Sequence, residues 1–388
     1  MKTIMISLLI MGVVTPTFSQ NPSAYRIFGE ILTVENKTYK GYITWAGNQN
    51  YWIDFFEASK INNPYKRYFH AGDGVIFSFN GQTSAYPPTH HFSCQFGNLS
   101  RIRLTGPNEI TLTLKNGQEC KVVKNRSRDI GYSLQIATDK EIIHIPWEQI
   151  SEITFQAADQ EDCFPLHPVY GILKSTQGIY KGLITWNTGK NDWNKNETIC
   201  LLLNKMKKIV RDKAILKVIP QADIAENFQL LNTDILYPIG QILVNMPNTG
   251  SVSVPWERFE TLEIIRPEEL SGLGYTDFPA PRPIQGKVTA RTGEIVQGTL
   301  VYDLDETLDI ETLDGKNDNI IYRIPFKYIR SVEPKNYKYS FIALRDGNSL
   351  SLGETCDVDQ ENSGMMVLGK DLPAVYIPWN EVKSVEIE

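Results

Sequence analysis

The sequence predicts an all-β protein built from three tandem repeat units, because two landmarks occur three times in the same order along its 388 residues. The first landmark is a glycine-containing hairpin pattern that begins at Gly29, Gly171 and Gly286. The second is a Pro-Trp pair followed by regularly spaced apolar residues, at Pro146-Trp147, Pro255-Trp256 and Pro378-Trp379. Apolar and polar residues alternate in both landmarks, as they do in half-buried strands.

The stretches between the repeats predict the unit boundaries. Residues 157–169 and 266–283 are rich in proline and acidic residues, a composition that favours extended linkers over helices or sheets. We therefore place the repeat units at residues 20–160, 161–280 and 281–388.

Each unit is expected to contain two related halves. In the third unit, the pattern over residues 324–332 returns over residues 377–385. The second half opens with a hairpin whose turn is Asn116-Gly117 in the first unit and Asp346-Gly347 in the third. Both dipeptides favour tight turns between two strands.

The Pro-Trp landmark predicts how a unit ends. Proline cannot donate a ladder hydrogen bond, so it ends or borders a strand. A short helical turn then leads into a last alternating strand. This succession of hairpin, third strand, fourth strand, short turn and fifth strand resembles the SH3-like or Sm-like small β-barrel, here as tandem repeats of an exported bacterial-type protein. The resemblance implies two small SH3-like barrels or comparable β-modules in each unit. Small β-sandwiches are the alternative.

Side chains at repeated positions are expected to be structural. A tryptophan at one fixed place in a repeated strand–turn–strand, flanked by regularly spaced aliphatic residues, is typical of a core. This applies to Trp147, Trp256 and Trp379, and equally to the aromatic residues that end the first hairpin: Trp45, Trp186 and Tyr302. The hairpin glycines Gly41, Gly182 and Gly298 predict close backbone packing or a bulge.

The N-terminus predicts export. Lys2 is followed by an uncharged, mostly apolar run over residues 4–14, and Thr17-Phe18-Ser19 places small residues at the −3 and −1 positions of a cleavage site. This is the arrangement of a signal peptide over residues 1–19. No later segment reaches 18 uninterrupted apolar residues, so we expect no transmembrane anchoring after cleavage. The mature protein is therefore predicted to be periplasmic, associated with the cell envelope, or secreted.

The charge balance argues against a nucleic-acid partner. The chain has 39 Lys plus Arg against 45 Asp plus Glu, a formal net charge of −6. A surface that neutralises phosphates needs a basic excess. The resemblance to exported SH3-like modules implies a partner of another class: an envelope polysaccharide, peptidoglycan or a protein.

The sequence contains no catalytic signature and predicts no cofactor. Its five histidines form no HExxH motif, and no GxSxG or Cys/His arrangement is present. Two acidic clusters lack the glycine and glutamate spacing of an EF-hand, and we expect them to be solvated loops without metal. They comprise Asp303, Asp305, Glu306 and Asp309, and Asp357, Asp359 and Glu361.

The five cysteines allow two interpretations. Cys94–Cys120 and Cys163–Cys200 are neighbours in sequence and are able to pair in an oxidising compartment, which leaves Cys356 over. The alternative is that these thiols are buried and act as small apolar side chains.

One insertion interrupts the repeat. The interval from Trp45 to Trp147 is about 25 to 32 residues longer than the matching intervals in the other units, and residues 64–95 are its most natural location. Insertions in repeats emerge as loops, where binding residues concentrate. The binding candidates are its aromatic and histidine side chains: Tyr65, Tyr68, Phe69, His70, Tyr86, His90 and His91. The alternative is a structural hairpin near residues 74–79.

Repetition without a catalytic signature favours an exported, non-enzymatic binding or scaffold protein of the cell envelope or extracellular space. Two alternatives remain open. One is a glycan-acting hydrolase whose site lies between repeat units and uses dispersed acids. The other is a purely structural spacer.

Overall fold

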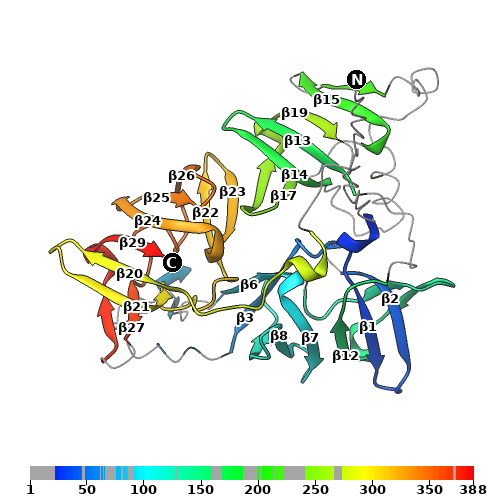
Figure 1. The fold of residues 1–388 in the computed structure, drawn as a ribbon, viewed down its shortest axis with the longest axis horizontal. Coiled ribbons are helices and arrows are strands. Elements are labelled where there is room, and N and C mark those ends of the chain that lie inside the picture. Colours follow the sequence, from blue (N-terminus) through cyan, green and yellow to red (C-terminus); the bar gives the residue numbers. More distant parts are fainter. Residues whose placement is uncertain are drawn as a thin grey trace, which may run out of the picture.

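The computed structural model is all-β, as the sequence predicts (Figure 1). It describes residues 22–45, 49–61, 63, 65, 76–79, 82–85, 91–127, 129–159, 168–186, 200, 203–212, 215–221, 241–265, 273–369 and 373–388. The predicted signal peptide, residues 1–19, lies outside this part of the chain, and so does Cys163. Within it, no helix is long and apolar enough to cross a membrane.

The N-terminal region is a ten-stranded antiparallel sheet with the order β11-β10-β2-β1-β12-β7-β8-β9-β3-β6. Its strands are β1 (Phe28–Thr33), β2 (Thr38–Thr44), β3 (Phe55–Lys60), β6 (His91–Gln95), β7 (Leu99–Leu104), β8 (Glu109–Leu114), β9 (Glu119–Val123), β10 (Leu134–Ala137), β11 (Ile142–Ile145) and β12 (Ile150–Phe155). The 3₁₀-helix η1 (Pro22–Tyr25) precedes them.

The C-terminal region repeats this strand order. Its pairings give β28-β27-β21-β20-β29-β24-β25-β26-β22-β23. The strands are β20 (Gln285–Ala290), β21 (Ile295–Tyr302), β22 (Thr312–Asn317), β23 (Ile320–Pro325), β24 (Ile329–Asn336), β25 (Tyr339–Leu344), β26 (Ser349–Gly353), β27 (Met365–Leu368), β28 (Val375–Ile377) and β29 (Val382–Ile387).

The middle region has part of the same pattern. Its hairpin β13–β14 pairs with β19 on one side and β17 on the other, as β1–β2 pairs with β12 and β10. An edge pairing of β18 with β23 joins it to the C-terminal region. Its strands are β13 (Tyr170–Ser175), β14 (Ile179–Trp186), β15 (Met206–Asp212), β16 (Ile215–Pro220), β17 (Gln241–Met246), β18 (Gly250–Pro255) and β19 (Phe259–Ile265).

The halves of a region are nested, whereas the sequence suggested that they follow one another. In the C-terminal region, an outer set (β20, β21, β27, β28, β29) is interrupted by an inner set (β22 to β26). Among the described strands of this region, only the β24–β29 pairing joins the two sets within the sheet. The N-terminal region has the same outer set (β1, β2, β10, β11, β12) and inner set (β3, β6, β7, β8, β9). Hairpin signals are local, so they do not report which distant strands pair.

The short helical turns predicted after Pro-Trp are present as three-residue 3₁₀-helices. In each, the residue after the helix donates its N–H to the carbonyl of the aromatic residue and begins the next strand. These are η4 (Trp147–Gln149), η7 (Trp256–Arg258) and η11 (Trp379–Glu381). The inner sets have equivalents, η3 (Phe96–Asn98) and η10 (Phe326–Tyr328), and η9 (Tyr275–Asp277) lies in the linker before β20.

Glycine pairs allow the hairpins to pack closely. Gly286 faces Gly298 across the β20–β21 hairpin, and the other two regions have the same pairing. A Cβ atom on Gly298 would lie 2.5 Å from the carbonyl oxygen of Leu368, and one on Gly286 would lie 2.1 Å from that of Glu386. Real Cβ contacts are longer, so these positions require glycine, which confirms the close backbone packing predicted from the sequence.

The described part of the insertion contains a hairpin that begins near residues 74–79, where the sequence allowed one. Strands β4 (Ile76–Phe79) and β5 (Gln82–Ala85) pair with each other and form a separate two-stranded sheet.

Candidate functional site

The repeated aromatic side chains lie in the cores, as expected. Ring centroids are 6.4 Å apart for Trp45 and Trp147 and 5.7 Å apart for Tyr302 and Trp379, so equivalent pairs contact each other in two regions. Trp256 is partly buried, and the other five are buried: Trp45, Trp147, Trp186, Tyr302 and Trp379. Their burial excludes a shared binding surface made of these rings.

Two buried aspartates, Asp129 and Asp357, occupy equivalent places that no sequence motif marks. Each lies on the segment that returns from the inner set to the outer set, and burial raises the pKa of each to about 7. The main-chain carbonyl of each aspartate accepts a hydrogen bond from the aromatic residue at the end of β2 or β21. The carboxylate of each accepts a hydrogen bond from a backbone N–H of β3 or β22. The donors are Trp45 Nε1 (2.9 Å) and Glu57 N (2.7 Å) for Asp129, and Tyr302 Oη (2.7 Å) and Asp314 N (2.6 Å) for Asp357.

The N-terminal and C-terminal regions are joined by a buried lysine. Lys60, at the end of β3, forms ion pairs with Glu311 and, at 3.1 Å, with Asp305. Burial would lower the pKa of Lys60, but the two carboxylates raise it above its ordinary value. Asn63 adds a hydrogen bond of 2.7 Å to the carbonyl of Leu304. These carboxylates are therefore committed to a cross-link between regions.

Arg323 makes the second cross-link between the same regions. Its guanidinium contacts Glu57 of β3 and Asp314 of β22, and lies 5.6 Å from the ring centroid of Phe55. Burial would raise the pKa of Glu57, but Arg323 and His91 lower it to about 2. Glu57 is thus an ion-pair partner and remains ionised at neutral pH.

The two binding candidates in the described part of the insertion have structural contacts. Tyr65 packs against the small apolar cluster of Val301, Leu304 and Met366 in the C-terminal region. His91 begins β6 and has its Nε2 3.6 Å from Glu57. The remaining candidates lie outside the described residues: Tyr68, Phe69, His70, Tyr86 and His90.

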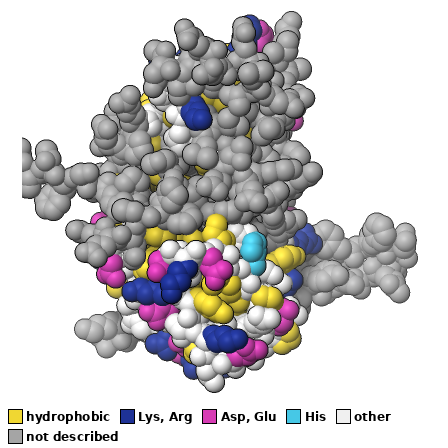
Figure 2. Space-filling model, turned by 90° about the vertical axis from the view of Figure 1, so that its right-hand side faces the viewer, with side chains coloured by type: hydrophobic (Ala, Val, Ile, Leu, Met, Phe, Trp, Pro, Cys, Tyr) yellow, Lys and Arg dark blue, Asp and Glu magenta, His cyan; other side chains and the backbone are white. Residues whose placement is uncertain are grey.

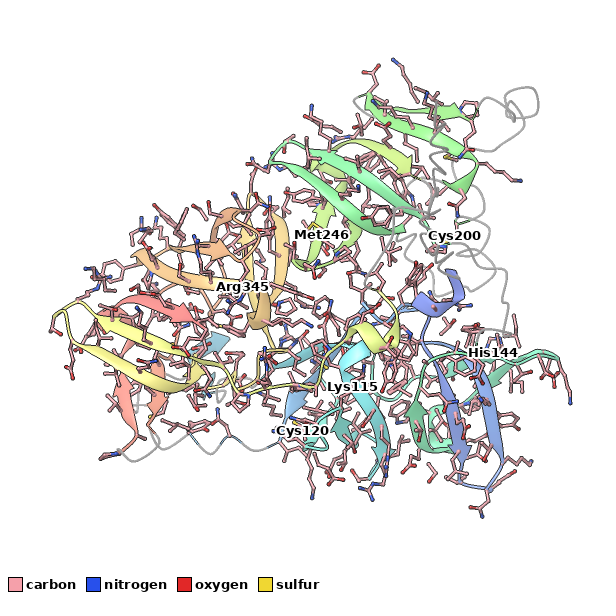
Figure 3. All side chains as sticks on the ribbon, viewed as in Figure 1. Lys115, Cys120, His144, Cys200, Met246 and Arg345 are labelled. Carbon is pink, nitrogen blue, oxygen red and sulfur yellow. The ribbon has the colours of Figure 1, made fainter. Side chains whose placement is uncertain are left out.

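The linker before the C-terminal region is fixed by Lys115, which lies near the centre of the view in Figure 3. Its ammonium group donates to the carbonyl of Phe278 (2.8 Å) and that of Tyr275, and lies 3.7 Å from the Tyr275 ring centroid. Burial lowers the pKa of Lys115 to about 8. The proline-rich linker is therefore packed against the N-terminal region.

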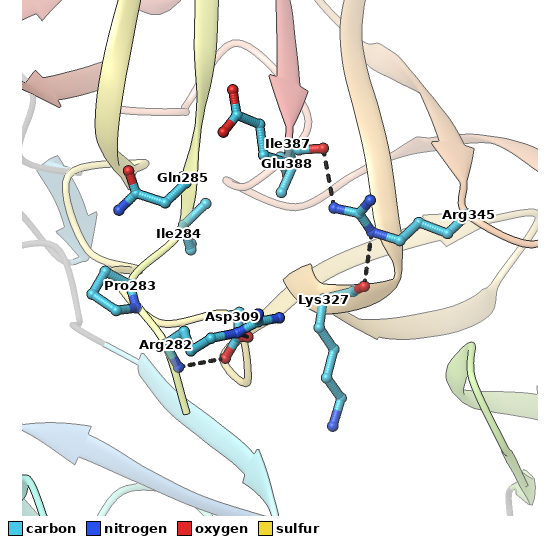
Figure 4. Close-up of a pocket in the computed structure, with 9 residues that line it drawn as sticks. All are labelled: Arg282, Pro283, Ile284, Gln285, Asp309, Lys327, Arg345, Ile387 and Glu388. Carbon is cyan, nitrogen blue, oxygen red and sulfur yellow. Dashed lines mark hydrogen bonds and ion pairs between the residues drawn. The ribbon is translucent and has the colours of Figure 1, made fainter. Parts of the chain in front are cut away.

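A pocket of about 660 Å³ opens where this linker meets the C-terminal region (Figure 4). Arg282, Lys327 and Arg345 supply cationic groups to its lining, against Asp309 and Glu388. Arg345 donates to the carbonyls of Lys327 and Ile387, both at 3.0 Å, which fixes one wall. The excess of cationic side chains stands out in a chain whose net charge is −6.

Lys327 is the pocket lysine whose ammonium group faces aromatic rings. Its Nζ lies 5.0 Å from the ring centroid of Tyr328 and 5.6 Å from that of Phe278. Burial lowers its pKa to about 8, so most of it is charged at neutral pH. Lys327 could not be recognised as a site residue from the sequence, because it follows Pro325-Phe326, which repeats the Pro-Trp pattern and predicts a structural turn.

Elsewhere the charges are mixed. On the described part of the face shown in Figure 2, basic and acidic side chains alternate with apolar ones and form no patch of one sign.

Cys94 and Cys120 are free thiols, and Cys94 is fully buried. Of the two interpretations of this pair, the structure therefore supports unpaired thiols. Cys356 is also a free thiol, and Cys200 lies far from Cys120 in Figure 3.

The expectation that the acidic clusters are solvated loops is wrong for the first cluster and for Asp357 of the second, whereas Glu361 is exposed. Asp303, Glu306, Asp309 and Asp357 are each at most 9% exposed. The two segments lie against each other, because the backbone N–H of Ser363 donates to Asp303.

Comparisons with known proteins identify no family. No protein-family model matches the chain, and no curated protein matches it. Among solved structures, a streptogramin B lyase structure shares 11% sequence identity over 87% of this chain and 99% of that chain, with a TM-score of 0.11. A likeness at this level carries no argument about fold or function.

Proposed function

We propose that this chain is an exported, non-enzymatic binding and scaffold protein of the cell envelope or extracellular space. Its repeat units, at 20–160, 161–280 and 281–388, act as paired β-modules of the SH3-like type. Strand order within the outer set supports this comparison. In the C-terminal region, β20 pairs with β21, β21 with β27, β27 with β28 and β20 with β29, and a 3₁₀-helix precedes the last strand.

The observation that carries the proposal is that the carboxylates between the N-terminal and C-terminal regions form ion pairs. A hydrolase that uses two acids needs one free to give a proton and another free to act as base or nucleophile. Asp305 and Glu311 are instead ion-paired with Lys60, and Glu57 and Asp314 with Arg323. Such pairs fix two regions in one orientation, which is what a scaffold requires.

The charge of the pocket at Arg282, Lys327 and Arg345 favours a ligand that carries carboxylates. Arginine and lysine bind carboxylates through charge-assisted hydrogen bonds. An acidic envelope polysaccharide and peptidoglycan both present carboxylates along a repeating polymer. We assign this polymer class to the pocket.

The insertion at 64–95 supplies a second contact with the same polymer. Aromatic rings with polar tips suit stacking on sugar rings. Tyr65 and His91 both contact the body of the protein. We assign the contact with the polymer to the other candidates of the insertion, which lie outside the described residues: Tyr68, Phe69, His70, Tyr86 and His90.

The test is co-sedimentation of the mature chain, residues 20–388, with insoluble peptidoglycan sacculi, together with retention on immobilised polygalacturonate and on neutral dextran. A pocket variant combines Arg282→Gln with Lys327→Gln. Its matched control is Arg330→Gln, which removes an exposed arginine on β24 outside the pocket. In a third variant, residues 66–90 are replaced by a short Gly-Ser turn.

We expect binding to at least one carboxylated probe and none to dextran. The pocket variant should bind about tenfold or more weakly, since a lost charge-assisted contact contributes roughly 1.5–3 kcal/mol. Arg330→Gln should bind like the parent chain. If only the insertion variant loses binding, the pocket assignment is wrong and the insertion is the site. If no probe binds, the binding function is refuted, and release of reducing ends from the same polymers would then favour the hydrolase.

A further inference from the structure

The C-terminal region has additional acidic groups around Asp357, the equivalent of Asp129 in the N-terminal region. β21 ends in a tight turn in which the N–H groups of Asp305 and Glu306 both donate to the carbonyl of Tyr302, each at 2.9 Å. Asp303 and Leu304 adopt positive φ angles of 49° and 53°. Leu304 is buried against Val301 and Met366, which holds the turn in place.

The segment between β26 and β27 meets this turn. Asp357 is 8% exposed, and Asn362 Nδ2 donates to its carbonyl at 3.0 Å. One ligand atom from each of Asp303, Cys356 and Asp357 lies within 4.8 Å of the others. Cys356 is the exposed member of the group and donates from Sγ to Asp357 at 3.4 Å. Two segments far apart in sequence therefore supply one cluster, with its thiol on the solvent side.

Glu306 gives an independent indication that the cluster has a ligand. The side chain is only 5% exposed, and its Oε2 has no hydrogen-bond partner among the described residues. Tyr302 and Glu306 are bridge partners, so their side chains share a face of the turn, and the hydroxyl of Tyr302 reaches the carbonyl of Asp357. Glu306 thus points to the side where Asp357 lies.

The hydrogen bonds of Asp357 to Tyr302 and Asp314 do not explain why further acids and a thiol lie beside it. Asp129 performs the same role in the N-terminal region with a neutral neighbour, Gln49, whose Nε2 donates to it at 2.8 Å. Three buried carboxylates and a thiol at the equivalent place are unfavourable without a cation, because a buried charge must be paired. The nearby ammonium of Lys60 is already paired with Asp305 and Glu311.

We propose that Asp303, Glu306, Cys356 and Asp357 form a binding site for a divalent transition-metal ion of the zinc class. Carboxylate oxygens and a thiolate, at bond lengths of about 2.0–2.3 Å, are ligands that Zn²⁺ accepts, whereas Ca²⁺ takes oxygen ligands only. The thiol at the surface gives the ion a route into the cluster. This site is independent of the polymer binding proposed above.

The experiment uses the full mature chain, stripped of metal with a chelator and dialysed. Zn²⁺ is titrated by calorimetry, and Co²⁺ is titrated by absorption, which detects a cobalt–thiolate bond as a charge-transfer band in the near ultraviolet. We expect one Zn²⁺ per chain, a Tm that rises with added Zn²⁺, and a Co²⁺ band that Zn²⁺ displaces.

Two variants test the ligands. Cys356→Ser should abolish the Co²⁺ band and weaken Zn²⁺ binding at least tenfold, and this exposed substitution leaves the core intact. Glu306→Gln should weaken Zn²⁺ binding tenfold to a hundredfold while the Co²⁺ band persists at saturation. Cys200→Ser and Asp359→Asn are matched controls, a thiol elsewhere and an acid in the same segment outside the cluster, and neither should change either readout.

Three results would overturn the assignment. The first is no heat and no change in Tm at tenfold excess Zn²⁺, which would mean that protons alone neutralise the cluster. The second is Zn²⁺ binding that survives both Cys356→Ser and Glu306→Gln unchanged, since the metal would then be bound elsewhere. The third is binding of Ca²⁺ without Zn²⁺ or Co²⁺, which would exclude the thiolate as a ligand.

Discussion

Removing Arg323 should loosen the connection between the N-terminal and C-terminal regions. Its guanidinium is mostly buried and contacts two carboxylates, those of Glu57 and Asp314. Arg323→Met keeps much of the apolar stem but leaves both acids without their cation. Breaking a buried ion pair by removing one partner costs about 3–5 kcal/mol. Since these side chains retain some exposure, we expect a loss of about 3 kcal/mol in the free energy of unfolding.

The pKa of Glu57 limits how much this carboxylate gains from its partners Arg323 and His91 together. Its folded-state value of about 2 lies below the ordinary value of 4.5. A lowered pKa means that the stabilisation is complete above pH 4.5 and is lost as pH falls towards 2. Lowering a pKa by one corresponds to about 1.4 kcal/mol, so Glu57 accounts for about 3 kcal/mol. Arg323 supplies the part of this stabilisation that His91 does not.

The assay is a double-mutant cycle with Arg323→Met, Glu57→Gln and the double variant, measured by urea unfolding at pH 7 and followed by tryptophan fluorescence. We expect a coupling energy of about 1–3 kcal/mol. The exposed pair Lys37–Glu35 is the matched control, and Lys37→Met should leave the unfolding midpoint unchanged. A coupling energy near zero, or an Arg323→Met variant as stable as the parent, would refute the cross-link.

Three further changes test other parts of the structure. Gly298→Ala should destabilise by about 2–4 kcal/mol in urea unfolding, because its Cβ would lie 2.5 Å from the carbonyl oxygen of Leu368; a loss below about 0.5 kcal/mol would contradict the close approach. Asp129 has its pKa raised to about 7, so it destabilises the fold increasingly as pH rises from about 4 to 7, by about 4 kcal/mol in all. Asp129→Asn should flatten the pH dependence of unfolding over that range, and an unchanged slope would argue against a buried, protonated carboxyl. Binding of polygalacturonate should weaken as pH rises through about 8, where Lys327 loses its charge, and Lys327→Gln should remove that step; a step that persists in this variant would assign it to another group.

Local structure could be predicted from the sequence because its signals are local. Asp346-Gly347 specifies a turn through positive φ at the glycine, which is 92°. Pro378 ends a strand and is followed by the short helix that begins at Trp379. The spacing of apolar residues around Trp147 correctly identifies a core side chain.

The pairing of distant strands could not be predicted in this way. The sequence pattern of β24 resembles that of β29, which indicates related halves, yet nothing in either strand shows that the β20–β21 hairpin pairs with β29 and β27. Ion pairs across regions, such as Lys60 with Glu311, depend on that tertiary arrangement. In the sequence, a charged residue at a strand end, such as Lys60, is therefore indistinguishable from an ordinary surface charge.

Nesting also explains why the two acidic clusters meet. The inner set is inserted between β21 and β27, and these strands pair with each other, with Tyr302 opposite Met365. The chain must therefore leave the outer set and return to it at neighbouring points, so residues 303–311 and 354–364 lie together. In the sequence, Asp303 and Asp357 look like members of separate loops, because their separation along the chain conceals the insertion.

The same geometry arises at Trp45 and Asp129, which establishes that the buried aspartate belongs to the architecture. The additional acids and the thiol belong only to the C-terminal copy, and this difference between two equivalent places is what distinguishes a binding site from a structural contact. A Zn²⁺ titration of Asp129→Asn should therefore match that of the parent chain, whereas Asp357→Asn should lose metal. Equal loss in both variants would show that the effect comes from the shared architecture.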